Sequence, residues 1–81
     1  MLHIGLDRVV RRQDILVILD VQKDLQEDTK SFLADLEAQG AREFCDKAKS
    51  IVVVTLDGQL RAIDSPISAS TLIKRGSVYS I

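Results

Sequence analysis

Residues 50–63 read SIVVVTLDGQLRAI, and this stretch decides the fold of the chain. Four β-branched residues in a row, at positions 51–54, are a strong strand signal. Asp57-Gly58 follows, and this dipeptide favours a type I′ hairpin turn because both central positions of that turn need a positive φ. Beyond the turn, apolar and polar residues alternate, as in a strand with one solvated face. The stretch therefore predicts a β-hairpin.

The first arm of this hairpin is apolar on both faces, since successive side chains of a strand point to opposite sides of the sheet. Residues 15–19, ILVIL, form a second run of the same kind. One clear helix and one short helix are too few to cover both faces of such strands. We therefore expect another subunit to cover them, which predicts a homo-oligomer in which strand faces or edges form the interface.

The rest of the chain is expected to form short elements around the hairpin. In order they are strands at 1–6, 9–10 and 15–19, a main helix at 25–39, a short strand at 42–46, the hairpin, a turn at 64–66, a C-terminal helix at 69–75 and a short strand or loose tail at 77–81. Asp24 and Glu27 suggest a capping box before the main helix, and Gly40 suggests its end. The expected fold class is α+β, with a small, mainly antiparallel sheet, one main helix and a short C-terminal helix.

Length and composition predict one domain spanning residues 1–81, because 46% of the chain is hydrophobic, as is normal for a compact domain. A single cysteine, Cys45, and a single histidine, His3, provide neither a disulfide framework nor a metal-ligand cluster. We expect Cys45 in the core and His3 at an exposed strand position. No signal-peptide pattern is present and the longest apolar run has five residues, which predicts a cytoplasmic protein without a membrane span.

Charge is unevenly distributed along the chain, although the net charge is only −1. Residues 20–37 contain six acidic and two basic residues, whereas the remainder contains nine basic and six acidic residues. A near-neutral total can therefore conceal a basic face.

The sequence carries no signature of a catalytic site. It has no phosphate loop, dinucleotide fingerprint, nucleophile elbow or metal-ligand spacing. Its four glycines lie singly at turn positions. We therefore expect that the protein is not an enzyme and has no metal and no cofactor.

Three groups of basic residues are the remaining functional lead: Arg11-Arg12, Lys47 with Lys49, and Lys74-Arg75. The last pair is explained by the negative end of the C-terminal helix. Two adjacent arginines suggest a loop that presents both, because neighbours in a strand point to opposite faces. Guanidinium groups suit phosphates and guanine edges. The basic residues thus indicate either contact with nucleic acid or ordinary surface charge.

Four segments of the chain resemble a known family: His3-Ile4-Gly5, Val9-Val10 followed by Asp14-Ile15, residues 49–53 (KSIVV) and residues 65–75 (SPISASTLIKR). Together they are similar to the bacterial extracellular matrix regulatory proteins (RemA/RemB), and most similar to the RemB branch. The resemblance covers nearly the whole chain, and the serine-rich entry to the last helix is its most specific part. It implies a DNA-binding transcriptional regulator of biofilm matrix genes whose α+β protomers assemble into a ring.

The DNA-binding residues expected from charge and resemblance are Arg11, Arg12, Gln13, Lys47 and Lys49. An Asn-Arg pair of the RemA branch corresponds here to Gln13 and Asp14, and a pair of arginines corresponds to Asp46 and Lys47. The expected partners are double-stranded DNA, further copies of the chain and a paralogous regulator. The alternative hypothesis is a ring-forming scaffold or protein-binding module with little or no DNA binding, which the acidic segment 20–37 and the acids at 14 and 46 favour.

Overall fold

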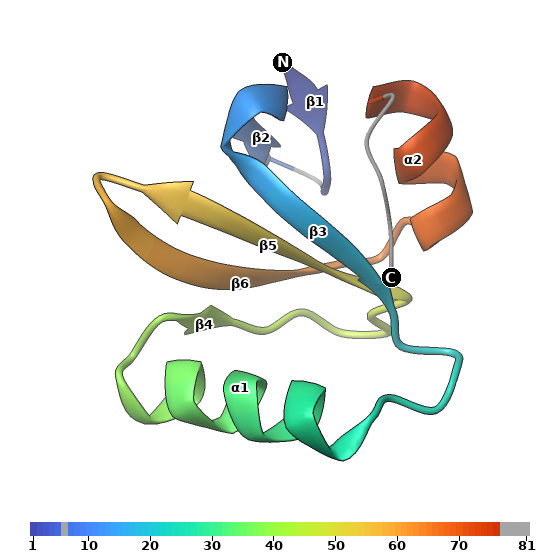
Figure 1. The fold of residues 1–81 in the computed structure, drawn as a ribbon. Coiled ribbons are helices and arrows are strands. Elements are labelled where there is room, and N and C mark those ends of the chain that lie inside the picture. The colour runs from blue at the N-terminus through green and yellow to red at the C-terminus, as the bar shows by residue number, and fades with distance from the viewer. Residues whose placement is uncertain (6, 77–81) are drawn as a thin grey trace.

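The computed structural model describes residues 1–5 and 7–76 (Figure 1). Its elements are β1 (Leu2–His3), β2 (Val9–Val10), the 3-10 turn η1 (Arg12–Asp14), β3 (Ile15–Asp20), α1 (Glu27–Ala38), β4 (Arg42–Glu43), β5 (Ser50–Leu56), β6 (Gln59–Ser65) and α2 (Ala69–Gly76). β1 and β2 form a two-stranded sheet, and the main sheet has the order β3-β5-β6-β4. The expectation for residues 77–81 lies outside the described residues.

The hairpin expected from the sequence is confirmed. β5 and β6 pair antiparallel from Ser50 opposite Ser65 to Leu56 opposite Gln59. The turn residues Asp57 and Gly58 have φ values of 53° and 78°, as a type I′ turn requires. β3 adds to β5 antiparallel and β4 adds to β6 parallel, so the α+β class with a mainly antiparallel sheet is also confirmed.

Both faces of β5 are covered within one chain. Val52 and Val54 belong to a core shared with Leu72 of α2 and with the β1–β2 sheet. Ile51 and Val53 belong to a second core, on the opposite face, which is closed by α1. Figure 1 shows α1 below the main sheet, and α2 with β1 and β2 above it. The expectation that another subunit must cover β5 is therefore wrong, because a sheet this narrow needs only one helix below and one helix with a small hairpin above.

β3 lies at an edge of the main sheet and contains a bulge. Ile15 pairs with Val54 and Val17 pairs with Val53, so Leu16 is the extra residue on β3. Leu16 is 58% exposed. The expectation that residues 15–19 are apolar and covered on both faces is thus wrong at Leu16, where the bulge turns the side chain out to solvent.

The helix boundaries correct some of the sequence predictions. α1 begins after Gln26, whose side chain makes no capping hydrogen bond, so the predicted capping box at Asp24 is wrong. Gly40 has a φ of 74° and follows the helix end as predicted. The Thr71 amide donates to the Ser68 hydroxyl at 3.4 Å, which caps α2.

A buried serine extends β6 beyond its predicted end. Ser65 was expected in a turn, but it is the last residue of β6 and is fully buried. Its hydroxyl donates to the Ile4 carbonyl and accepts from the Ile67 amide at 3.1 Å. The adjacent strand residue Ser50 donates its hydroxyl to the Ile67 carbonyl at 2.7 Å. These bonds attach the N-terminal strand and the entry to α2 to the middle of the sheet.

We predict that Leu72→Ala and Leu36→Ala each lower the free energy of unfolding by about 2–5 kcal/mol, because each removes a buried side chain from one of the two cores. Leu16→Ala is the matched control and should change stability by less than about 0.5 kcal/mol, since Leu16 is exposed. Urea denaturation followed by circular dichroism measures all three. A core substitution as mild as the control would contradict the two-sided burial of β5.

Candidate nucleic-acid interface

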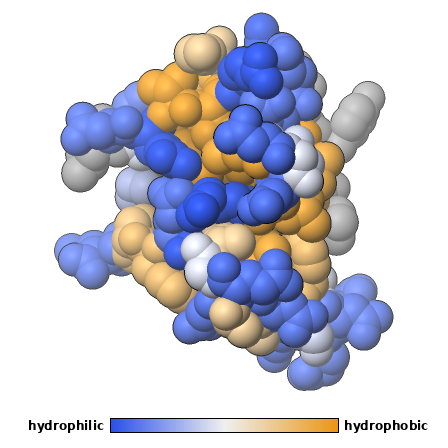
Figure 2. Space-filling view, turned by 90° about the vertical axis from the view of Figure 1, so that its left-hand side faces the viewer, coloured by the Kyte–Doolittle hydropathy of each residue, from blue (hydrophilic) through white to orange (hydrophobic). Residues whose placement is uncertain are grey.

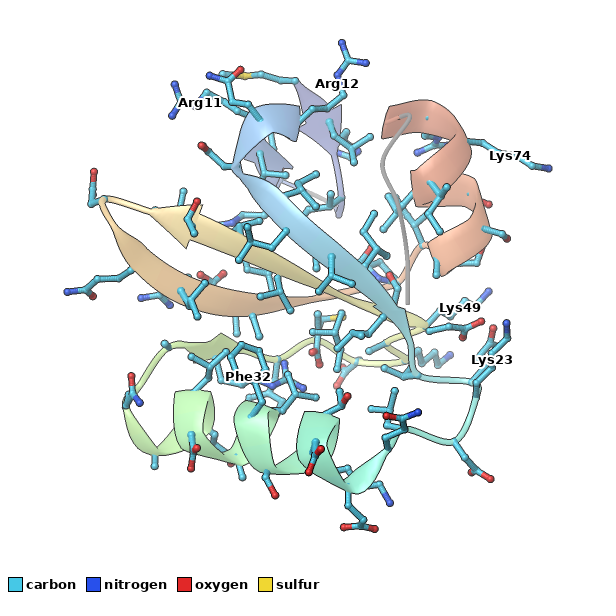
Figure 3. The ribbon with its side chains drawn as sticks, viewed as in Figure 1. Arg11, Arg12, Lys23, Phe32, Lys49 and Lys74 are labelled. Carbon is cyan, nitrogen blue, oxygen red and sulfur yellow. The ribbon has the colours of Figure 1, made fainter. Side chains whose placement is uncertain are left out.

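The five residues predicted to contact DNA do not form one site. Arg11 precedes η1, and Arg12 and Gln13 lie in it, at the start of β3. Lys47 and Lys49 lie in the loop before β5. Because β3 and β5 are antiparallel, with Asp20 opposite Ser50, this loop is at the far end of β3 from η1. A strand of this length spans about 17–20 Å. Figure 3 accordingly shows Arg11 and Arg12 at one end of the molecule and Lys49 beside Lys23 at another.

η1 holds Arg11 and Asp14 together. The Asp14 amide donates to the Arg11 carbonyl at 3.0 Å, which closes the turn. Arg11 donates from Nε to Asp14 Oδ2 at 2.9 Å and from Nη2 to Oδ1 at 3.2 Å. The hydrogen bond and the charge of Asp14 raise the pKa of Arg11, so its guanidinium stays charged. Arg12 and Gln13 are exposed beside this pair.

Three other arginines form ion pairs that connect strands. Arg8 and Arg61 both donate to Glu43 Oε2, at 2.9 and 3.3 Å. Arg42 pairs with Asp64, and its guanidinium lies 4.5 Å from the ring centroid of Phe44. The Arg42 and Asp64 side chains are only 11% and 7% exposed. These contacts give the three arginines a structural role in joining β4, β6 and the chain before β2.

Lys47 and Lys49 are exposed in the loop that leads into β5. The Lys49 amide donates to the Ser65 carbonyl at 2.8 Å, and its carbonyl accepts from the Val21 amide at 3.3 Å. Asp46 directly precedes Lys47, and Lys23 lies beside Lys49 in Figure 3. This end of the sheet therefore carries both acidic and basic residues.

Acidic and basic residues that are separated along the sequence also lie on opposite sides of the main sheet. Five of the six acids of residues 20–37 lie on α1 or on the loop before it, on the lower side of the sheet in Figure 1. η1 and α2 lie on the upper side, and residues 65–76 contain no acid. We define the basic end as Arg11, Arg12, Lys74 and Arg75, all of which are exposed. Figure 3 shows Arg12 and Lys74 both on this upper half, with Lys74 pointing outward from α2.

Sequence reasoning missed the contribution of α2 to this surface. Lys74 and Arg75 were assigned to the helix dipole, which explains their presence but not that they lie on the same side of the main sheet as η1. The missing acids after Asp64 were the available signal. Packing of α2 against β3 and β1 places that acid-free segment on the same side of the main sheet as the two arginines.

A groove lies between η1 and the tip of the β5–β6 hairpin. Arg8, Arg11, Asp14 and Asp57 contribute its polar lining, and Val9 is among its apolar residues. Figure 2 looks at the hairpin end of the molecule and shows apolar side chains in the upper part of this face, bordered by hydrophilic ones. Arg11 and Asp14 therefore sit where a ligand can approach them from solvent.

Cys45 is exposed, so the expectation that it lies in the core is wrong. The chain leaves the sheet after β4, which carries the thiol outward. Partial desolvation of the thiol, together with the charges of Asp64 and Asp46, raises the pKa of Cys45. This environment is the opposite of one that activates a thiolate. His3 is exposed on β1, as predicted.

Among the residues that the structure describes, no group of three or more His, Cys, Asp or Glu side chains is arranged to hold a metal ion. Within 1–5 and 7–76, no helix has the length and apolar character needed to cross a bilayer.

Comparison of the chain with protein-family models, curated proteins and solved structures gave no match.

We predict that Asp64→Ala lowers the free energy of unfolding by about 3–5 kcal/mol, because it leaves the Arg42 guanidinium buried without its carboxylate. The control is Glu27→Ala, which removes an exposed partner 3.6 Å from Lys30 and should cost less than about 1 kcal/mol. Chemical denaturation measures both. Equal effects would show that the Arg42–Asp64 pair does not support the sheet.

We also predict that alkylation of Cys45 by iodoacetamide reaches its half-maximal rate at a higher pH than alkylation of a free cysteine in a short peptide. Partial desolvation of the thiol, and then the charges of Asp64 and Asp46, disfavour the thiolate, so the pKa of Cys45 is raised. Asp46→Asn should move the profile to lower pH because one of these charges is removed. Mass spectrometry of timed samples gives the rates, and an unchanged profile in the variant would refute the contribution of Asp46.

Proposed function

We propose that this chain is a DNA-binding regulator that works as a homo-oligomer and contacts DNA through the basic end. One observation carries the proposal: exposed cations from η1 and α2 lie on one side of the sheet, while the acids of α1 lie on the other. DNA that approaches the basic end would meet Asp14 beside Arg11, but fewer acids than it would meet at the α1 face.

The resemblance to the extracellular matrix regulatory family supports the same proposal and narrows it to transcriptional control of biofilm matrix genes in the cytoplasm. We propose a binding role and not a catalytic one. Arg12, Lys74 and Arg75 would contact phosphates, with Gln13 as a further hydrogen-bonding group at the base edges or backbone. Lys47 and Lys49, at the other end of β3, would serve a more distant part of the DNA backbone.

Assembly would strengthen this binding. One basic end supplies few contacts, but several linked copies gain from effective concentration when DNA reaches more than one at a time. The exposed edge of β3 and the exposed apolar side chains of Met1, Val9 and Leu16 support self-association. A ring is the closed form of assembly that we propose.

The separation of charge also favours a second candidate, a scaffold with little DNA binding. The basic end of one copy could contact the acidic α1 face of another copy or of a paralogous regulator. Such a contact would neutralise the cations that the first candidate assigns to phosphates. The two candidates therefore differ in what the basic end touches.

We predict that binding to a mixed-sequence duplex weakens steeply between about 50 and 200 mM salt, since phosphate contacts release counterions. Arg12→Ala combined with Lys74→Ala should weaken binding and reduce the salt slope by about 2 for each engaged protomer. Lys30→Ala removes a positive charge from α1, on the acidic side of the sheet, and should have little effect. Fluorescence anisotropy measures all three proteins.

Two results would contradict the first candidate: binding that does not change with salt, or a loss in Lys30→Ala as large as that in the Arg12 and Lys74 double variant. If fragmented genomic DNA is not bound at all, and if the oligomer dissociates when Arg12 and Lys74 are replaced, the scaffold is supported instead. Analytical ultracentrifugation of the same variants supplies the second measurement.

A further inference from the structure

The contact between Arg11 and Asp14 uses one defined edge of the guanidinium. Asp14 accepts hydrogen bonds from Nε and from Nη2 of Arg11, at 2.9 and 3.2 Å. This leaves the second hydrogen of Nη2 and one hydrogen of Nη1 side by side on the outer edge, while the other hydrogen of Nη1 points toward the Cδ side. Two parallel donors therefore point away from the carboxylate.

The Asp14 side chain is largely buried, whereas the Arg11 guanidinium is accessible to solvent. The Asp14 side chain is 15% exposed, whereas that of Arg11 is 57% exposed. The Asp14 amide bonds to the Arg11 carbonyl at 3.0 Å, and Asp14 leads directly into β3. The rotamer freedom of Arg11 is thus restricted before any ligand binds, which lowers the entropic cost of using its outer edge.

The charge of Asp14 determines which ligand suits this edge. A phosphate bound to Arg11 would bring a second anion close to the Asp14 carboxylate, which is unfavourable. The O6 and N7 atoms of guanine are uncharged acceptors spaced for two parallel N–H donors. A guanine edge therefore uses the outer donors of Arg11 without that repulsion.

We infer that Arg11, held by Asp14 as a positioning residue, reads a guanine in the major groove of duplex DNA. This inference rests on the proposed function and adds sequence preference to it. Arg11 would specify a base, while Arg12 and the basic residues of α2 would contact phosphates.

The test uses matched variants of the full chain. Asp14→Asn removes the charge that holds Arg11, and Asp57→Asn removes a charge from the same groove without touching that pair. Asn suits position 57, where φ is 53°. Wild type and both variants are used to select from a pool of duplexes with a randomised centre, and the bound DNA is sequenced. The preferred duplex is then made with 7-deazaguanine, which lacks the N7 acceptor.

Wild type and Asp57→Asn should enrich guanine at one position, and 7-deazaguanine there should weaken their binding on the order of tenfold. Asp14→Asn should lose the preference while binding mixed DNA as well as or better than wild type. Arg11→Ala should also lose it, and circular dichroism should show all variants folded.

A guanine preference that survives Asp14→Asn, or binding insensitive to 7-deazaguanine, would overturn the inference. Binding of wild type without any base preference would overturn the inference alone and leave the proposed function standing. Failure of wild type to bind any duplex would overturn both.

Discussion

Burial of β5 on both faces is the constraint on which the rest of the structure depends. Residues 51–54 are at most 3% exposed, and they divide between two cores on opposite sides of one strand. Full burial of an aliphatic side chain contributes about 1.5–3 kcal/mol, so this short run is a large part of the stability of so small a domain. Each remaining element is placed by the face that it covers: α1 on one side, and α2 with the β1–β2 sheet on the other.

This arrangement also separates the charges. A sheet covered on both sides keeps its two coverings apart, so the acids of α1 and the bases of η1 and α2 end on different surfaces. The arginines divide in the same way. Arg8, Arg42 and Arg61 pair with carboxylates near the sheet, whereas Arg12 extends into solvent. Arg11 does both, because it pairs with Asp14 while its side chain remains exposed.

Two buried serines connect these features. Ser65 bonds to the Ile4 carbonyl, and both Ser50 and Ser65 bond to the Ile67 backbone. They attach the N-terminal strand and the start of α2 to the same point of the β5–β6 hairpin. The relative positions of η1 and α2, and so the geometry of the basic end, depend on polar contacts inside an otherwise apolar layer.

The sequence by itself determined what depends on neighbours along the chain: the Asp57-Gly58 hairpin, the helix end at Gly40, the α+β class and the uneven distribution of charge. Only the tertiary structure decided what depends on distant segments. The coverage of β5 within one chain, the bulge at Leu16 and the distance between Arg11 and Lys49 all follow from strand register and layer packing. A one-residue register shift or a change of layer reverses which side a residue faces while leaving local propensity unchanged. For that reason the candidate residues could be named from the sequence, but their grouping required the fold.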